Sequence, residues 1–248
     1  MGTGSRFADH ADTDGHHLGG TVMSKEIIRF SDTLYGIKED FVTCHLVIGD
    51  DKAVLFDTAV EPGLKEEIGK LTGLPVSVYH THCDGDHMGS DGEFSEIYMH
   101  PAEYDYCKIK DMPGRLPVWE NETVKIGQYN FRTILLSGHT PGSLAYFDEE
   151  KGLLFPGDFV PEGAEEFMFG PGRNIRTYRE SLSRIYKLKD KIKAIYQPHG
   201  KAVSDSSIID EYIEMVDLIL EGKLQGEECE VHDHKVLRVT HKRAGIFI

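Results

Sequence analysis

Three histidines and two aspartates fall within eight consecutive positions of this chain. The segment reads His80-Thr81-His82-Cys83-Asp84-Gly85-Asp86-His87 and follows the apolar run 74–78. In an extended chain, side chains two residues apart project to the same side, so His82, Asp84 and Asp86 can converge on one point while His87 begins the next segment. Imidazole and carboxylate groups bind metals, so the spacing predicts a metal site at the end of a strand.

Three later segments each place a residue of ligand type beside turn residues, directly after an apolar run. They are Leu136–Ser143 with His139, Leu154–Asp158 with Asp158 at its end, and Tyr196–Gly200 with His199. Glycine and proline at these points end a strand and hold the following side chain at its edge. Several strand ends could therefore bring these residues to the first motif.

From about Met23 onward, the chain resembles the metallo-β-lactamase superfamily. The family signature reads Thr-His-x-His-x-Asp-His-x-Gly, and Thr81-His82-x-Asp84-x-Asp86-His87-x-Gly89 has the same spacing, with Asp84 in place of the second histidine. The resemblance implies an α/β fold, a four-layer αββα sandwich of two mixed sheets with outer helices. Strand clusters followed by helices, twice along the chain, agree with that architecture.

The resemblance also implies two divalent metal ions and assigns a ligand to each. One metal is expected at His82, Asp84 and His139, a second at Asp86, His87 and His199, with Asp158 between the two. Because carboxylate is a harder ligand than imidazole, Asp84 moves the preference of the first site from zinc toward iron or manganese, and zinc stays a candidate.

Two further residues are expected behind the metals. Asp57 ends an apolar strand and resembles the family's supporting aspartate, although it could equally cap the following turn. A different register, starting at His80, would leave Asp86 and His87 unexplained. We therefore interpret His80 as a strand residue that supports a ligand.

The implied activity is hydrolysis by a hydroxide that bridges the metals and attacks a small ester, thioester, lactone or phosphoester. Asp86 is the expected proton shuttle. Two alternatives remain open: a diiron oxygen or nitric-oxide reductase module of the flavodiiron type, which carries a carboxylate at the position of Asp84, and a non-catalytic metal-binding protein.

The loop 161–176 is expected to overhang the site. Arg173 or Arg176 could contact an anionic substrate there; the other interpretation of these arginines is a solvated helical face.

Composition limits the partners. The 248 residues are 40% hydrophobic and 28% charged, with a formal net charge of −15. Residues 23–248 are expected to form a single domain, and 1–22 a leader or loose tail. The negative charge argues against nucleic acid, and no apolar run has the length of a membrane span. We expect a small-molecule substrate and leave the oligomeric state open, a homodimer included.

The four cysteines, at positions 44, 83, 107 and 229, form no Cys-x-x-Cys pair. This scatter predicts reduced thiols in a cytoplasmic protein, with Cys83 as a packing residue.

Hydrophobic periodicity predicts the remaining elements. Strands are expected at 27–29, 34–38, 41–48, 53–56, 96–99, 129–136, 143–147, 153–155 and 194–197, and helices at 62–71, 102–108, 177–188 and 205–220.

Overall fold

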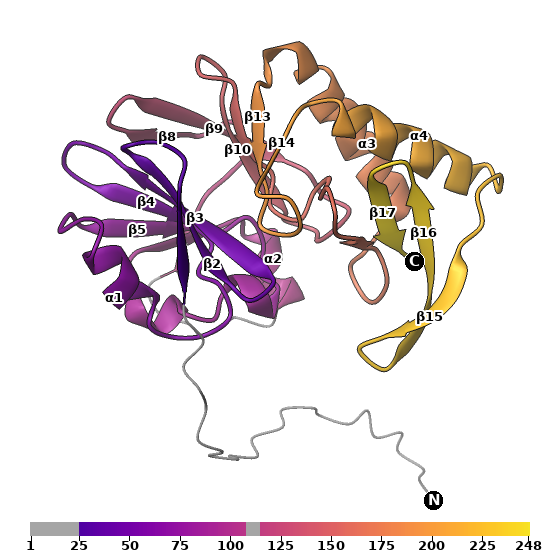
Figure 1. Cartoon of the computed structure of the whole chain (residues 1–248), viewed down its shortest axis with the longest axis horizontal. Coiled ribbons are helices and arrows are strands. Elements are labelled where there is room, and N and C mark those ends of the chain that lie inside the picture. The colour runs from indigo at the N-terminus through magenta and orange to yellow at the C-terminus, as the bar shows by residue number, and fades with distance from the viewer. Residues whose placement is uncertain (1–24, 108–114) are drawn as a thin grey trace, which may run out of the picture.

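The structure is a computed structural model that describes residues 25–107 and 115–248. The tail predicted for residues 1–22 lies outside the described residues, as does Lys108 at the end of a predicted helix. Two large sheets pack face to face, with helices on their outer sides (Figure 1). The predicted four-layer αββα sandwich is confirmed.

The first sheet has seven strands in chain order, antiparallel from β1 to β4 and parallel from β4 to β7. They are β1 (Glu26–Arg29), β2 (Leu34–Glu39), β3 (Val42–Ile48), β4 (Ala53–Phe56), β5 (Val76–Tyr79), β6 (Ile97–Met99) and β7 (Arg115–Pro117). Because β4 and β5 are parallel, their carboxyl ends lie at the same edge. Asp57 and the metal motif therefore leave the sheet side by side.

The second sheet has six strands in the order β14-β13-β11-β10-β9-β8. They are β8 (Thr123–Ile126), β9 (Tyr129–Leu135), β10 (Leu144–Asp148), β11 (Leu153–Phe155), β13 (Ala194–Tyr196) and β14 (Val203–Ser204). Strand β10 is antiparallel to β9 and β11, and β11 is parallel to β13, so β9, β11 and β13 run in one direction. His139, Asp158 and His199 follow their carboxyl ends.

Aromatic side chains fill the space between the two sheets. Phe56 of the first sheet stacks on Tyr146 of the second with ring centroids 4.5 Å apart and meets Phe131 edge-on at 5.3 Å. Phe155 joins the same cluster, and all four rings are buried. Burial of each such side chain contributes about 2–3 kcal/mol, so this layer fixes the position of one sheet on the other.

In residues 25–107 and 115–248, four α-helices cover the sheets. They are α1 (Leu64–Gly69), α2 (Ala102–Tyr106), α3 (Ile175–Tyr186) and α4 (Ile208–Leu220). Helix α1 buries Leu64 and Ile68 in the apolar cluster on the outer side of the first sheet. Helices α3 and α4 lie together over the second sheet, where Tyr178 and Tyr212 are fully buried (Figure 1). Each predicted helix is present; the start at 102 and the end at 220 agree with the prediction, and the other ends differ by two or three residues.

A third sheet was not predicted from the sequence. It pairs β12 (Glu166–Phe167) with β17 (Ala244–Phe247), followed by β16 (His234–His241) and β15 (Glu227–Val231), and lies beside α4 (Figure 1). In β16 only every third residue is buried, so the alternation that indicates a strand is missing. This sheet holds Glu166, which contacts the site described below.

Gly89, just after the metal motif, lies against the loop that follows β4. Its amide donates to the carbonyl of Ala59 (2.7 Å), and an added Cβ would lie 1.8 Å from the carbonyl oxygen of Val60. We predict that Gly89→Ala lowers the free energy of unfolding by at least about 2 kcal/mol, because backbone must move to admit the methyl group. Gly92→Ala is the matched control, since nothing lies within 4 Å of its Cβ position. Equal urea midpoints for both variants would contradict the prediction.

Candidate metal centre

The metal motif leaves β5 in extended conformation and then tightens. Asp84 is extended, with φ −67° and ψ 150°, and the 3₁₀ turn Gly85–His87 follows. This change of direction brings Asp86 and His87 to a different position from His82. The motif therefore supplies two neighbouring clusters, which loops of the second sheet complete.

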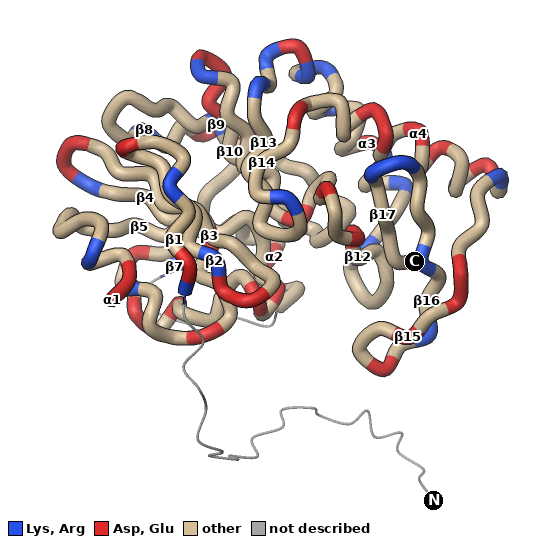
Figure 2. The backbone as a smooth tube through the Cα atoms, viewed as in Figure 1, with Lys and Arg blue, Asp and Glu red and all other residues tan. Residues whose placement is uncertain are grey.

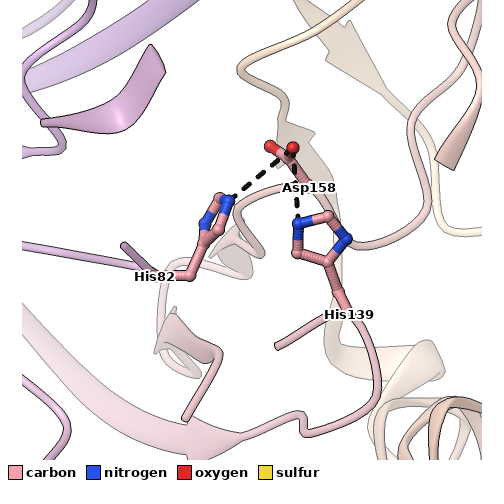
Figure 3. Close-up of side chains that lie close together, drawn as sticks. All are labelled: His82, His139 and Asp158. Atoms are coloured by element: carbon pink, nitrogen blue, oxygen red, sulfur yellow. Dashed lines mark ion pairs between the residues drawn. The ribbon is translucent and has the colours of Figure 1, made fainter. Parts of the chain in front are cut away.

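The first cluster contains His82, His139 and Asp158 (Figure 3). The Nε2 atoms of both imidazoles lie 3.8 Å from Asp158 Oδ2. Asp84 Oδ2 lies 3.6 Å from His82 Nε2 and 3.2 Å from His139 Nε2. All four residues that the sequence predicts around the first metal, the shared Asp158 included, are thus brought together.

The second cluster contains Asp86, His87 and His199. Asp86 Oδ2 lies 3.6 Å from His87 Nε2 and 3.3 Å from His199 Nε2, and the two Nε2 atoms are 3.3 Å apart. Asp158 Oδ1 lies 3.0 Å from His87 Nε2 and 3.3 Å from His199 Nε2. Asp158 therefore presents one oxygen to each cluster.

The four histidines of the two clusters direct Nε2 toward the cluster, and a contact at the other ring nitrogen, Nδ1, holds each ring in place. That of His87 contacts Asp57 Oδ2 (2.9 Å), that of His139 contacts Glu166 Oε1 (2.6 Å) and that of His199 contacts the carbonyl of Phe41 (3.0 Å). For His82 the partner is Thr81 Oγ1 at 2.9 Å, whose proton goes to Asp57 Oδ2 (2.7 Å). Such contacts fix the ring orientation and leave each Nε2 available to a metal.

Asp57 and His80 lie beneath the clusters. Asp57 Oδ1 accepts the amide of Thr81 (2.8 Å) and faces His80 Nδ1 (3.3 Å), while His80 Nε2 lies 2.9 Å from Asp91 Oδ1. Burial alone would lower the pKa of His80, but the carboxylates of Asp91 and Asp57 raise it to about 9. Burial would likewise raise the pKa of Asp57, yet His87 and His80 hold it well below its usual range.

Glu166 was missed by the sequence analysis. Its side chain is fully buried, and Oε1 contacts His139 Nδ1. Burial raises the pKa of Glu166 to about 7, although His139 acts in the opposite direction. Glu166 lies 27 residues after His139 in an unpredicted strand, so no spacing in the sequence connects the two residues.

The two arginines predicted near the substrate lie in different environments. Arg173 Nη2 forms an ion pair with Asp84, and its guanidinium lies over the ring of Tyr106, 5.6 Å from the centroid. Arg176 is exposed in the first turn of α3, where its backbone N–H donates to the N-cap Asn174. Within the described residues, only Arg173 of the pair contacts the metal motif.

The donor set fits divalent metals. A tetrahedral zinc site with bonds of about 2.0 Å has ligand atoms about 3.3 Å apart, and the distances within both clusters lie near that value. His82 Nε2 is buried and makes no hydrogen bond to a described residue. Burial alone would lower the pKa of His199, but Asp158 and Asp86 raise it to about 10. The same negative field would attract a metal cation.

One prediction about the cysteines was wrong. Cys83 and Cys107 form a disulfide with their Cα atoms 6.3 Å apart, whereas Cys44 and Cys229 are free. The pair is separated by 24 residues and forms only because α2 returns to the metal motif, which local spacing could not reveal. The expectation of a cytoplasmic protein depended on reduced thiols and stays a prediction.

The family is shown by comparison with known proteins. Residues 37–221 match the family model of the metallo-beta-lactamase superfamily, and the chain belongs to this superfamily. It is 24% identical over 139 residues to a Bacillus subtilis protein described as "Probable metallo-hydrolase YqgX", covering 48% of this chain and 66% of that one. It is 30% identical over 167 residues to hydroxyacylglutathione hydrolase of Gloeobacter violaceus, covering 62% of each chain. The chain thus spans less than two thirds of the length of both relatives.

A solved structure shares the fold. A metallo-beta-lactamase from Pontibacter korlensis aligns with a TM-score of 0.67 and 16% sequence identity, over 78% of this chain and 99% of that one. At this identity the likeness bears on the fold alone. In the described part of the chain, no helix is long and apolar enough to cross a membrane.

Glu166 provides a test of the support for His139. We predict that Glu166→Gln weakens metal binding at the first cluster about 10- to 100-fold, because the amide no longer supplies the charge that orients and polarises the imidazole. Binding at the second cluster should not change. Glu165→Gln is the matched control, since Glu165 instead pairs with Arg238. Chelator competition measures both affinities, and a first-cluster affinity equal to that of the control would contradict the assigned role.

Proposed function

We propose that this protein is a metal-dependent hydrolase that holds two divalent cations at the edge of the sandwich, where strands of both sheets end. The observation that carries the proposal is the convergence of four histidine Nε2 atoms, each with its Nδ1 engaged elsewhere, around the shared carboxylate of Asp158. Membership of the metallo-beta-lactamase superfamily supports the same chemistry.

The proposed ligands fall into two sets with one shared residue. His82, Asp84 and His139 hold the first cation, and Asp86, His87 and His199 hold the second. Asp158 contributes an oxygen to each. Zinc, iron and manganese are the candidate metals, because the set mixes imidazole with carboxylate.

When bound, the cations lower the pKa of a shared water toward neutrality and polarise the bond under attack. The protein contributes the proton transfer. Asp86 is the proposed shuttle because its side chain is 25% exposed, more than that of Asp158 at 12%, so it can reach both water and a leaving group. Asp57 and Glu166 keep the histidines oriented throughout.

The rim of the site suggests a small ester or thioester that combines apolar and anionic parts. Phe41 is 55% exposed and stacks on His199, with ring centroids 5.8 Å apart. Arg173 offers a cation beside Asp84 at the first cluster. The relative from Gloeobacter violaceus is a hydroxyacylglutathione hydrolase, which supports a thioester among the candidates. Arg176 is set aside as a substrate contact because it is exposed in α3.

Charge supports a small-molecule substrate rather than nucleic acid. The chain carries a formal net charge of −15, and in Figure 2 basic residues are dispersed among acidic ones along the described backbone. Binding to a phosphate backbone requires a concentrated basic surface.

A diiron reductase of the flavodiiron type is a second candidate, favoured by one observation. Asp84 supplies a carboxylate at the second motif position, next to His139. The two functions are separated by loading the purified chain with iron and measuring oxygen consumption with a reduced flavin donor alongside ester cleavage. Oxygen consumption without hydrolysis would favour the reductase.

Metal removal and one ligand variant test the proposed hydrolase. The intact chain should bind two equivalents of metal, lose turnover on chelation and recover it on reloading, when assayed with thioester, lactone, phosphodiester and phosphotriester substrates. We predict that His139→Ala lowers turnover by more than about 100-fold, since it removes a ligand outright. His234→Ala, in the exposed hairpin, is the control. Full turnover with both metals retained in His139→Ala would contradict the proposed site.

Asp84 allows a test of metal choice. We predict that Asp84→His raises the preference for zinc over manganese or iron, because imidazole replaces a hard oxygen ligand. Asp84→Ala should weaken the first site and leave the second intact. Competitive metal loading of the three proteins under one condition makes the comparison. Identical metal ratios in all three would show that Asp84 coordinates no metal.

A further inference from the structure

The disulfide Cys83–Cys107 lies directly on the metal motif. Cys83 stands between His82 and Asp84 in the sequence, and Cys107 follows the last residue of α2. Cys83 is 3% exposed, whereas Cys107 is only partly buried. Cys107 is therefore the less buried member of the pair, and Cys83 is fixed beside two proposed ligands.

Helix α2 is bonded to both loops that supply the first cluster. The buried carboxylate of Glu103 accepts the amide of Cys83 at Oε2 (3.0 Å) and the amide of Gly142 at Oε1 (2.6 Å). Gly142 lies three residues after His139. A displacement of α2 would therefore reach His82 and Asp84 on one side and His139 on the other.

A second connection runs through Tyr106, the residue before Cys107. The Arg173 guanidinium lies over the Tyr106 ring, and Arg173 Nη2 pairs with the Asp84 carboxylate. A Cβ on Gly172 would lie 2.4 Å from Tyr106 Cε2, so the 172–173 backbone is packed closely on that ring. The disulfide thus closes a ring of contacts that fixes Asp84 through both its backbone and its side chain.

The surroundings suit the reduced pair as well as the disulfide. Cys107 Sγ lies 3.0 Å from the carbonyl oxygen of Cys83, and Cys83 Sγ lies 3.7 Å from that of Glu103. Once the two sulfurs separate, each thiol therefore has a backbone carbonyl oxygen nearby as an acceptor. Cleavage of the disulfide would remove the covalent link between α2 and the metal motif.

We propose that Cys83–Cys107 is a redox site whose reduction by a dithiol weakens metal binding at the first cluster. The inference rests on the proposed function, because the expected change is in metal binding at the first cluster. A thiolate of the dithiol attacks Sγ of Cys107, the less buried cysteine, and releases Cys83 as a thiolate, which takes up a proton. The second thiol of the reagent then displaces Cys107. The protein gains two thiols and the dithiol becomes a disulfide, so two electrons and two protons are transferred.

The test compares the full chain in its two redox states. One sample is kept oxidised, and one is reduced with dithiothreitol, which is then removed so that it cannot bind metal. Alkylation should count two free thiols in the first sample and four in the second. Both samples are loaded with zinc and titrated with a chelator. We expect reduction to lower the affinity of the first metal about 10-fold and to leave the second unchanged.

Two variants identify the cysteines responsible. Cys107→Ser should behave like the reduced wild-type chain under both conditions. Cys229→Ser, which removes a thiol away from the pair, should respond to reduction as the wild-type chain does. If Cys107→Ser does not fold, the wild-type comparison and the Cys229→Ser control still decide the question.

The outcomes separate the redox site from the proposed function. If the protein binds two metals and the affinity of each is the same before and after reduction, the redox site is overturned and the hydrolase proposal stands. An increase in metal bound on reduction, or a response that persists in Cys107→Ser, also overturns it. A chain that binds no metal in either state overturns both proposals.

Discussion

The carboxylate of Asp57 is the group on which the site's geometry depends most. It is buried at the end of β4, yet it accepts hydrogen bonds from the Thr81 amide and hydroxyl and contacts the Nδ1 atoms of His80 and His87. A buried charge is tolerated only when it is fully hydrogen-bonded and paired, so each of these partners is obliged to stay in place. One residue thus fixes the path of the chain after β5 and the orientation of His87, and acts on His82 through Thr81.

His139, which follows a strand of the second sheet, is oriented by a carboxylate from the third sheet. Glu166 supports His139 as Asp57 supports His87, but it comes from β12, which is held by pairing with β17. Tyr212 of α4 adds to this anchoring, since its hydroxyl lies within hydrogen-bond distance of the carbonyl oxygens of Pro161, before β12, and Gly245, in β17. The C-terminal hairpin is therefore connected to a metal-facing histidine, although none of its own residues enters the clusters.

The sequence predicted those features that depend on local spacing. The clustered histidines and aspartates and most of the strands along the chain follow from turn residues after apolar runs. The parallel pairing of β4 with β5 and of β11 with β13 brings those turns to one edge. Features set by contacts between distant segments were missed. Glu166 meets His139 through the third sheet, and Cys107 meets Cys83 through the return of α2. Neither contact produces a periodic pattern in the sequence. Each depends on single residues that lie far apart along the chain, so the residues around them give no signal of the contact.

Asp84 and Arg173 together show how the family signature can change at one position without a change of net charge. An aspartate in place of a neutral imidazole adds one negative charge beside His139. That charge would strengthen cation binding but weaken the attraction of the site for an anionic substrate. Arg173 returns one positive charge directly at the Asp84 carboxylate, and its planar guanidinium is held over Tyr106. The ion pair therefore carries no net charge, as a neutral histidine would, while it presents a carboxylate oxygen where the family signature has an imidazole nitrogen. On the proposed ligand assignment, the departure from the motif would change the metal preference and leave the overall charge of the site the same.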